Sequence, residues 1–155
     1  MSNSVLTLKQ MITGYWQSQA IYVAAKLELA DKLAAGAKSA EELAKETETN
    51  AGALFRMLRA LASVGVFTQQ ADGKFANSPL SAPLQKTAED SQWAMAVMMG
   101  EEHFAAWGEL LYSIQTGRGS FRKVFGEGVF DFLSKHPDQA QVFDAAMTSI
   151  HGKET

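Results

Sequence analysis

The feature that most constrains this sequence is a helix-turn-helix pattern followed at once by a hairpin. Ser39 and Glu42 are spaced as a capping box, in which each side chain accepts a hydrogen bond from a free amide of the first helical turn. A second amphipathic helix over 51–64 ends before a glycine. Its apolar face comprises Leu54, Met57, Leu58, Leu61 and Ala62. Short apolar segments then flank Asp72-Gly73, which suits a tight hairpin turn, so the order predicts a winged helix-turn-helix.

Two strongly apolar helices are predicted before this motif. Apolar residues recur at helical spacing at Val5, Leu8, Ile12, Tyr15 and Trp16, and then at Ile21, Ala24, Ala25 and Leu29. The second segment is predicted to end at Gly36, because glycine is favoured after a helix. A small domain seldom needs two helices this apolar, so two interpretations stay open. The stripes either pack in the core or form a helix-exchanging dimer interface.

A second, all-helical region is predicted after Pro79 and Pro83, because prolines interrupt helical periodicity. We therefore expect one domain over 1–84 and a helical region over 85–155. Asp90 is expected to cap the first helix of this region, and Pro137 to begin the last. The expected fold class is mainly α, a winged helix with a small β-hairpin wing that is followed by further helices.

The composition excludes several classes of function. The 155 residues contain no cysteine, which rules out thiolate metal sites, disulfide frameworks and cysteine nucleophiles. The three histidines, His103, His136 and His151, are the strong nitrogen ligands that remain. The N-terminus lacks the pattern of a secretory signal, and no apolar run is long enough for a membrane helix. A cytoplasmic location without a membrane partner is therefore expected.

The charge distribution argues against nucleic acid as a partner. The formal net charge is −3. Within 39–64 the acidic residues are Glu41, Glu42, Glu46 and Glu48, and the basic residues are Lys45, Arg56 and Arg59. A unit that reads a DNA groove normally carries a clear basic excess for phosphate contacts. A packing role is therefore favoured, and a small winged-helix transcriptional regulator with an effector pocket remains the alternative.

No catalytic, metal-binding or phosphate-binding motif such as GxSxG, HExxH or a P-loop is present. The glycine pairs at 117/119 and 126/128 lack the preceding strand and third glycine that a nucleotide cradle needs. The run Glu101-Glu102-His103 is interpreted as two solvated glutamates beside one inward histidine rather than as an acid/base or metal cluster. No metal site and no catalytic residue is therefore expected.

One group of residues is a candidate for a ligand pocket. Met99, His103 and Trp107 form one stripe if the helix runs unbroken through the glycine that follows Met99. Phe143 and Met147 repeat this spacing on the last helix. Methionines and aromatics around a single imidazole would suit a flat apolar ligand, although such stripes most often pack in the core.

A series of short segments has an order that is found in a known family. The series runs through Ala30-Asp-Lys-Leu33, Glu42-Leu-Ala44, 54–67, Asn77-Ser-Pro-Leu80, Trp107-Gly-Glu-Leu110, Thr116-Gly117, Phe130, His136-Pro137 and Phe143-Asp-Ala-Ala-Met147. It resembles the N-terminal dimerisation domain of plant-type S-adenosylmethionine-dependent small-molecule O-methyltransferases, in particular bacterial relatives of the hydroxyneurosporene and acetylserotonin types. The resemblance covers nearly the whole chain.

The resemblance implies a fold and an assembly. In that family the winged helix interlocks with its copy in an intertwined homodimer. The helices that follow form a lid over the substrate pocket of a Rossmann-like methyltransferase domain. It therefore implies a dimerisation domain over 1–84, a linker and lid over 85–155, and a small aromatic or polyketide-like hydroxyl acceptor. Part of the first helix enters the partner's active site in this family, which makes Tyr15 and Trp16 candidates for that role.

Pocket positions also carry over by resemblance. Phe143 and Met147 match positions that line the acceptor pocket, and Met99 and His103 match further ones. Two departures stand out, because Leu133 and Gln139 replace a pocket histidine and an aromatic residue of plant enzymes. Plant phenylpropanoid acceptors are therefore not implied.

The elements that bind the cofactor in this family are absent from the sequence. Family enzymes follow the last helix with a strand, a glycine-rich acidic loop for S-adenosylmethionine and then a histidine that acts as general base. This chain ends at Thr155 before either. We expect it to be inactive alone, to bind no cofactor, and to expose apolar surface after Pro83. A stand-alone ligand-binding or scaffold protein is a third reading.

Overall fold

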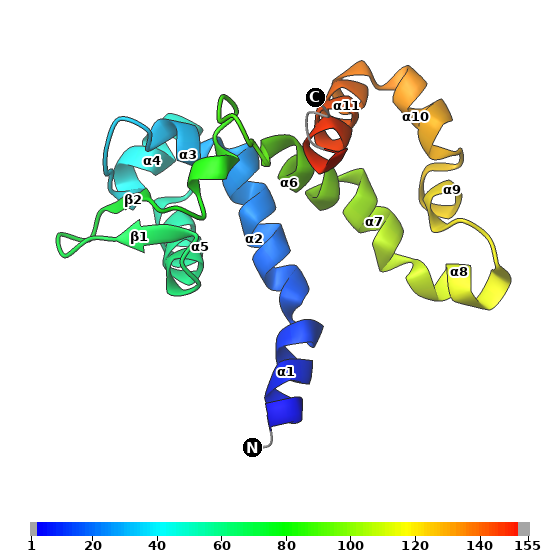
Figure 1. The fold of residues 1–155 in the computed structure, drawn as a ribbon, viewed down its shortest axis with the longest axis horizontal. Helices are drawn as coiled ribbons and strands as arrows, with labels where there is room; N and C mark the ends of the chain where they lie inside the picture. The colour runs from blue at the N-terminus through cyan, green and yellow to red at the C-terminus, as the bar shows by residue number, and fades with distance from the viewer. Residues whose placement is uncertain (1–2, 152–155) are drawn as a thin grey trace. The chain divides into compact units, whose positions relative to one another are not determined.

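The computed structural model describes residues 3–151, and it is mainly helical with one small antiparallel sheet. The chain divides into two compact units, which meet between Ser91 and Gln92. The first unit contains α1 (Asn3–Ile12), α2 (Gly14–Lys26), α3 (Leu29–Lys32), α4 (Ala40–Thr47), α5 (Ala51–Ser63), β1 (Phe67–Gln69), β2 (Phe75–Asn77) and the 3-10 helix η1 (Ala82–Leu84) (Figure 1). The second contains α6 (Trp93–Gly100), α7 (Glu102–Gly108), α8 (Leu110–Thr116), α9 (Ser120–Phe125), α10 (Val129–Lys135) and α11 (Pro137–His151).

The predicted capping box at the start of α4 is confirmed. The Glu42 amide donates to the Ser39 hydroxyl at 3.2 Å, and the Ser39 amide donates to the Glu42 carboxylate at 2.7 Å. Asn50 caps α5 in the same way, accepting from the Ala53 amide at 2.9 Å. The two helices pack together over a core of buried side chains: Leu43, Leu54, Leu58 and Leu61.

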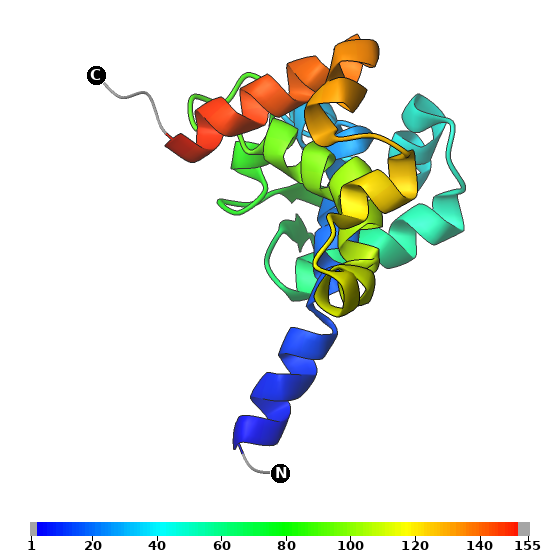
Figure 2. The same ribbon diagram turned by 90° about the vertical axis from the view of Figure 1, so that its right-hand side faces the viewer.

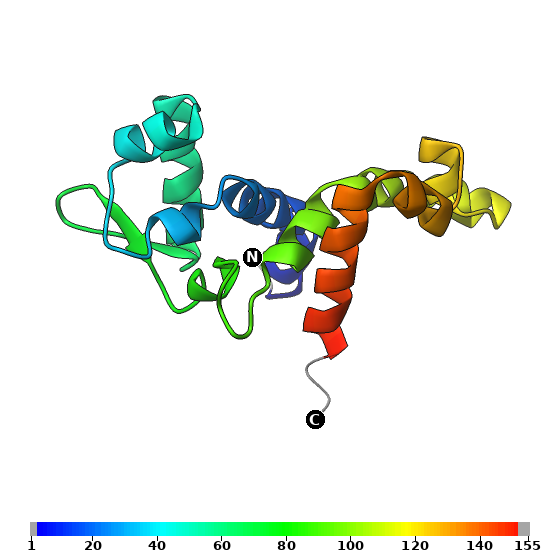
Figure 3. The same ribbon diagram turned by 90° about the horizontal axis from the view of Figure 1, so that it is seen from above.

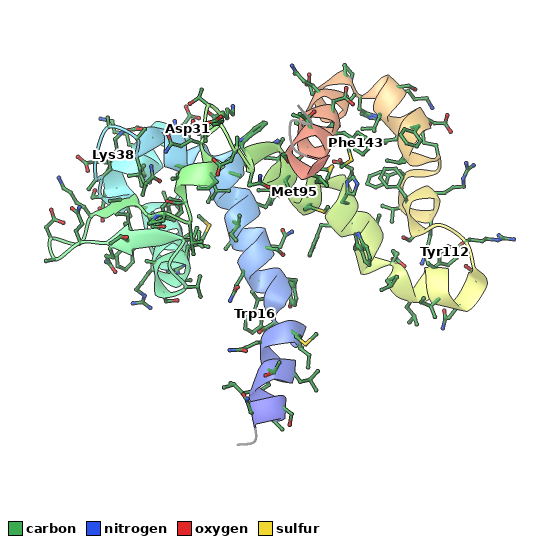
Figure 4. All side chains as sticks on the ribbon, in the orientation of Figure 1. Trp16, Asp31, Lys38, Met95, Tyr112 and Phe143 are labelled. Carbon is green, nitrogen blue, oxygen red and sulfur yellow. The ribbon has the colours of Figure 1, made fainter. Side chains whose placement is uncertain are left out.

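The predicted hairpin is also present, with five residues, 70–74, between its strands. β1 and β2 pair antiparallel, with Thr68 opposite Ala76. Gly73 has a φ of +86°, the left-handed conformation that glycine adopts without cost. Lys38 adds a bridge to the hairpin, because its backbone donates to Phe75 at 3.0 Å and accepts from it at 2.8 Å (Figure 4). Phe67 and Phe75 bury their rings beneath the sheet.

The first compact unit continues beyond the predicted division after residue 84. The Lys86 amide donates to the Asp31 carboxylate at 3.1 Å, and the Lys86 ammonium pairs with Glu28. Leu84 is buried in the same unit. These contacts tie the proline-containing segment to α3. The assignment of two functional domains stays a prediction.

The N-terminal helices end at other residues than the sequence predicts. The first helix ends at Ile12, so Tyr15 and Trp16 lie on α2. The Thr13 hydroxyl donates to the Lys9 carbonyl at 2.9 Å, and glycine follows it, which is a poor residue for continuing a helix. The helix predicted to end at Gly36 ends earlier, at Lys32. α1 has no buried residue and projects beyond α2 (Figures 1 and 2).

The second unit is built around α6 and α11, which lie side by side (Figure 3). Ala94, Met98 and Ala146 form its buried centre. Partly buried side chains surround them: Trp93, Met95, Val142, Phe143 and Met147. The predicted cap at Asp90 is wrong, because Gln92 occupies the N-cap of α6 and makes no side-chain cap bond.

A phenylalanine cluster joins α9 to α10. The Phe121, Phe125 and Phe132 ring centroids are separated by 4.6 Å, 4.9 Å and 5.5 Å. His136 stacks on Phe132 at 3.9 Å and uses its Nδ1 to contact the Phe132 carbonyl at 2.7 Å, so this histidine has a structural role. Over residues 3–151, no helix has the length and apolar character needed to cross a membrane.

Candidate functional site

The predicted stripe of Met99, His103 and Trp107 is interrupted. The helix breaks at Glu101, whose backbone angles of −98° and −116° separate α6 from α7. Met99 therefore lies at the end of α6, whereas His103 and Trp107 lie on α7. The condition of an unbroken helix is wrong, and the stripe does not form a continuous face.

The interpretation of Glu102 as a solvated residue is also wrong. Its side chain is only 5% exposed, and its Oε1 lies 3.3 Å from Nδ1 of His103. A buried carboxylate needs a hydrogen-bonding partner, and the neighbouring imidazole supplies one. The described residues hold no group of three possible metal ligands. The side chain of His151, the third histidine, lies outside the described residues.

His103 joins two parts of the second unit. Its ring stacks on Phe143 with a centroid distance of 6.3 Å and an angle of 22°. Phe143 comes from α11 and also meets Phe130 edge to face at 6.3 Å (Figure 4). Phe143 and Met147 are partly buried and pack against the buried centre of this unit, so both side chains contribute to its core.

An apolar cavity of about 300 Å³ opens beside His103. Its lining comprises His103, Ala106, Trp107, Leu110, Ser120, Phe121 and Val129. Two of these, His103 and Trp107, are among the predicted pocket residues. The others come from α7, α8, α9 and α10, and the recurring phenylalanines Phe121, Phe125 and Phe130 are the one sequence feature that could have pointed to them. Trp107 is 64% exposed and forms an open wall of the cavity.

The N-terminal helices present a second candidate site, an exposed apolar face. Trp16 is 61% exposed and meets Tyr15 edge to face, with centroids 6.0 Å apart. The other large apolar residues of this face are Val5, Leu6, Leu8, Met11 and Ile12. The interpretation as core is wrong for these residues, since none of them is buried in the chain. It is confirmed for Ala24, Ala25 and Leu29, which are buried, and the dimer interface stays a prediction.

Two exposed groups outside the cavity lining have shifted pKa values. A hydrogen bond that the Lys135 ammonium donates to the Glu127 carboxylate, helped by the charge of that carboxylate, raises the pKa of Lys135 above its usual value. Hydrogen bonds from the Glu41 backbone and from the Ser39 hydroxyl lower the pKa of the Glu41 carboxyl. Both effects belong to helix ends.

Comparison with known proteins gives a consistent result. Residues 9–87 match the model of the O-methyltransferase dimerisation domain. The phenazine O-methyltransferase PhzM of Lysobacter antibioticus is 48% identical over 139 residues, which are 90% of this chain and 41% of that protein. The crystal structure of LaPhzM matches with a TM-score of 0.93 and 44% identity, over 96% of this chain and 45% of that one.

The fold also extends to distant enzymes. Human N-acetylserotonin methyltransferase in complex with S-adenosylmethionine matches with a TM-score of 0.88 at 21% identity, over 97% of this chain and 46% of that one. The chain thus spans less than half of the length of these proteins.

Proposed function

The chain belongs to the O-methyltransferase dimerisation-domain family, and we propose that it serves as the dimerisation and substrate-lid portion of an S-adenosylmethionine-dependent O-methyltransferase. The acceptor is a hydroxyl of a small aromatic or polyketide-like molecule. One observation carries the proposal: the segment that matches the family exposes large apolar side chains on α1 and α2, namely Met11, Ile12, Tyr15 and Trp16. A cytoplasmic location is part of the same proposal.

In this proposal residues 1–84 form a winged helix within an intertwined homodimer. The order of α4, α5 and the hairpin, together with the Lys38 bridge to Phe75, supports the winged helix. The exposed face supports the homodimer, because a patch of large apolar side chains is stabilised when a second copy covers it. Tyr15 and Trp16 then contribute to the partner's substrate pocket.

The second unit, with the linker before it, supplies the lid over the acceptor. His103 and Trp107 line the cavity, and Phe143 stabilises the His103 ring by stacking on it. Met99 and Met147 complete the proposed pocket from α6 and α11. A mostly apolar cavity with one imidazole and one hydroxyl suits a flat ring that carries few polar groups.

The residues described here do not fit S-adenosylmethionine, and we infer that this chain alone does not hold it. The strands of the described part are the two of the hairpin, and no strand leads into a glycine-rich turn. Gly117 and Gly126 have positive φ values of 68° and 79° because they end α8 and α9. We therefore assign the methyl-transfer step to a separate cofactor-binding domain. The relatives are more than twice as long as the part that this chain matches, so they can contain such a domain.

The alternative of a transcriptional regulator has no support. The family match and the relatives named above concern methyltransferases. Arg59 on α5 also lies over the Phe55 ring, at 6.0 Å from its centroid, and so has a partner within the fold.

A chimera tests the proposed function. Residues 1–151 of this chain would replace the corresponding part of the Lysobacter enzyme, and transfer of a labelled methyl group to hydroxylated phenazines and naphthalenes would be measured. We expect transfer by the chimera and none by the chain alone. The original enzyme and its isolated cofactor domain are the controls. A folded, dimeric chimera that binds S-adenosylmethionine but methylates none of these acceptors would contradict the proposal.

A further inference from the structure

A buried carboxylate adjoins the histidine of the apolar cavity without being part of the cavity lining. Glu102 is the first residue of α7, its side chain is 5% exposed, and its Oε1 lies 3.3 Å from Nδ1 of His103. Within residues 3–150, this imidazole is the hydrogen-bonding partner of the Glu102 side chain. Burying a carboxylate is unfavourable unless a partner replaces the lost water, so the two side chains depend on each other.

The contact determines where the proton of the His103 ring lies. A neutral imidazole carries one proton, and imidazole is a stronger base than a carboxylate, so the proton between the two groups stays on the ring. Nδ1 therefore donates to Oε1 of Glu102, and Nε2 keeps its lone pair. Phe143 stacks on the same ring at 6.3 Å and limits its rotation (Figure 4). The ring thus has one tautomer and one orientation.

Nε2 of His103 is the atom of this pair that a ligand can reach. Within residues 3–150 it has no hydrogen-bonding partner, and it is not one of the buried polar atoms that lack a partner. The His103 side chain lines the cavity and is 21% exposed. Ser120 is the other lining side chain that can accept a hydrogen bond, because the Trp107 indole only donates. The cavity therefore offers a ring nitrogen to a ligand that carries a hydrogen-bond donor.

We propose that Glu102 is a positioning residue: it holds His103 with its proton on Nδ1, so that Nε2 accepts a hydrogen bond from the hydroxyl of an aromatic ring in the cavity. The inference rests on the proposed function and deepens it, because it names the residues that recognise the hydroxyl. A methyl ether has no proton to donate, so the pair binds a free hydroxyl in preference to its methylated form. Neither residue takes part in methyl transfer.

The first test is the tautomer itself. Nitrogen NMR of the 155-residue chain with labelled histidine, at about pH 8 where free imidazole is neutral, distinguishes protonated from unprotonated ring nitrogens. The variant His103→Phe identifies the signals of His103 among those of the three histidines. We expect the proton on Nδ1 in the unaltered chain. Glu102→Gln is expected to give a mixture of tautomers, because an amide can either accept from Nδ1 or donate to it. Glu89→Gln removes the same charge from an exposed position and is expected to change nothing.

The second test is calorimetric titration of the same chain with 2-naphthol and with its methyl ether, 2-methoxynaphthalene. We expect naphthol to bind roughly fivefold more tightly than the ether, which is the effect of one hydrogen bond. His103→Phe keeps an aromatic ring beside Phe143 and is expected to lose the preference. Glu102→Gln is expected to reduce it, and Glu89→Gln to keep it.

Several outcomes would overturn the inference. In the unaltered chain, these are a His103 proton on Nε2 or equal affinities for naphthol and its ether, and neither measurement depends on a variant that folds. In the variants, they are an unchanged tautomer in Glu102→Gln, a preference that survives His103→Phe, or a preference that only Ser120→Ala removes.

The methylation assay of the chimera separates this inference from the proposed function. A chimera that transfers methyl groups, from a chain without the tautomer or the preference, overturns this inference alone. An inactive chimera, from a chain that has both, contradicts the proposed function and leaves the role of Glu102 intact.

Discussion

Ser39 joins the start of α4 to its own first turn by two hydrogen bonds, to and from Glu42. Replacing it in Ser39→Ala leaves the Glu42 amide without its acceptor. We expect a loss of about 1 kcal/mol in the free energy of unfolding. Chemical denaturation measures this, and Ser39→Thr is the control that keeps the hydroxyl. An unchanged midpoint for Ser39→Ala would show that the capping box contributes nothing.

Glu48 ends the same helix in a conformation that suits glycine. Its φ of 54° is left-handed, and its side chain is exposed. Glu48→Gly is expected to raise the free energy of unfolding by roughly 0.5–1 kcal/mol, because glycine adopts this conformation without steric cost. The matched change Lys45→Gly, at an exposed position inside α4, is expected to lower it by about 1 kcal/mol. Destabilisation by both variants would contradict the assignment of the left-handed cap.

At the scale of elements, α1 is a helix whose apolar residues contact no core. Ile12→Glu places a charge on the exposed apolar face and is expected to weaken dimerisation at least tenfold, since burying an isoleucine contributes about 2 kcal/mol. Gln10→Glu adds the same charge at another exposed position of α1 and serves as the control. Dissociation constants from dilution would settle the comparison, and equal effects of the two changes would exclude this face from the interface.

Elements that depend on a few neighbouring residues could be predicted from the sequence. Helix breaks that depend on tertiary packing could not. The capping box at Ser39 and the left-handed Gly73 each depend on residues that are close together in the sequence, so the sequence predicts α4 and the hairpin. No short motif in the sequence indicates the helix break at Glu101. Because of this break, Met99 lies on a different helix from His103 and Trp107. The predictions of a continuous stripe and of a solvated Glu102 are both wrong at this junction. The cavity forms where α7 packs on α9. The spacing of apolar residues along the sequence does not predict which helices pack together.

At the scale of the whole molecule, the second unit exposes apolar side chains, as the sequence predicted. The most exposed ones are Trp107, Leu111, Ile114 and Phe130. We expect the chain to bind a dye for hydrophobic surface more strongly than the chimera with the Lysobacter cofactor domain does, because that domain would cover part of this surface. Equal dye fluorescence from the two proteins would contradict the role of this unit as a lid.

The central claim is that the exposed face of α1 and α2 is covered by a second copy of the chain. Sedimentation equilibrium of the 155-residue protein at tens of micromolar measures this most directly. We expect twice the mass of the chain, and dissociation when Ile12→Glu is introduced. A single species with the mass of one chain, at every concentration up to that range, would show that no second copy covers this face.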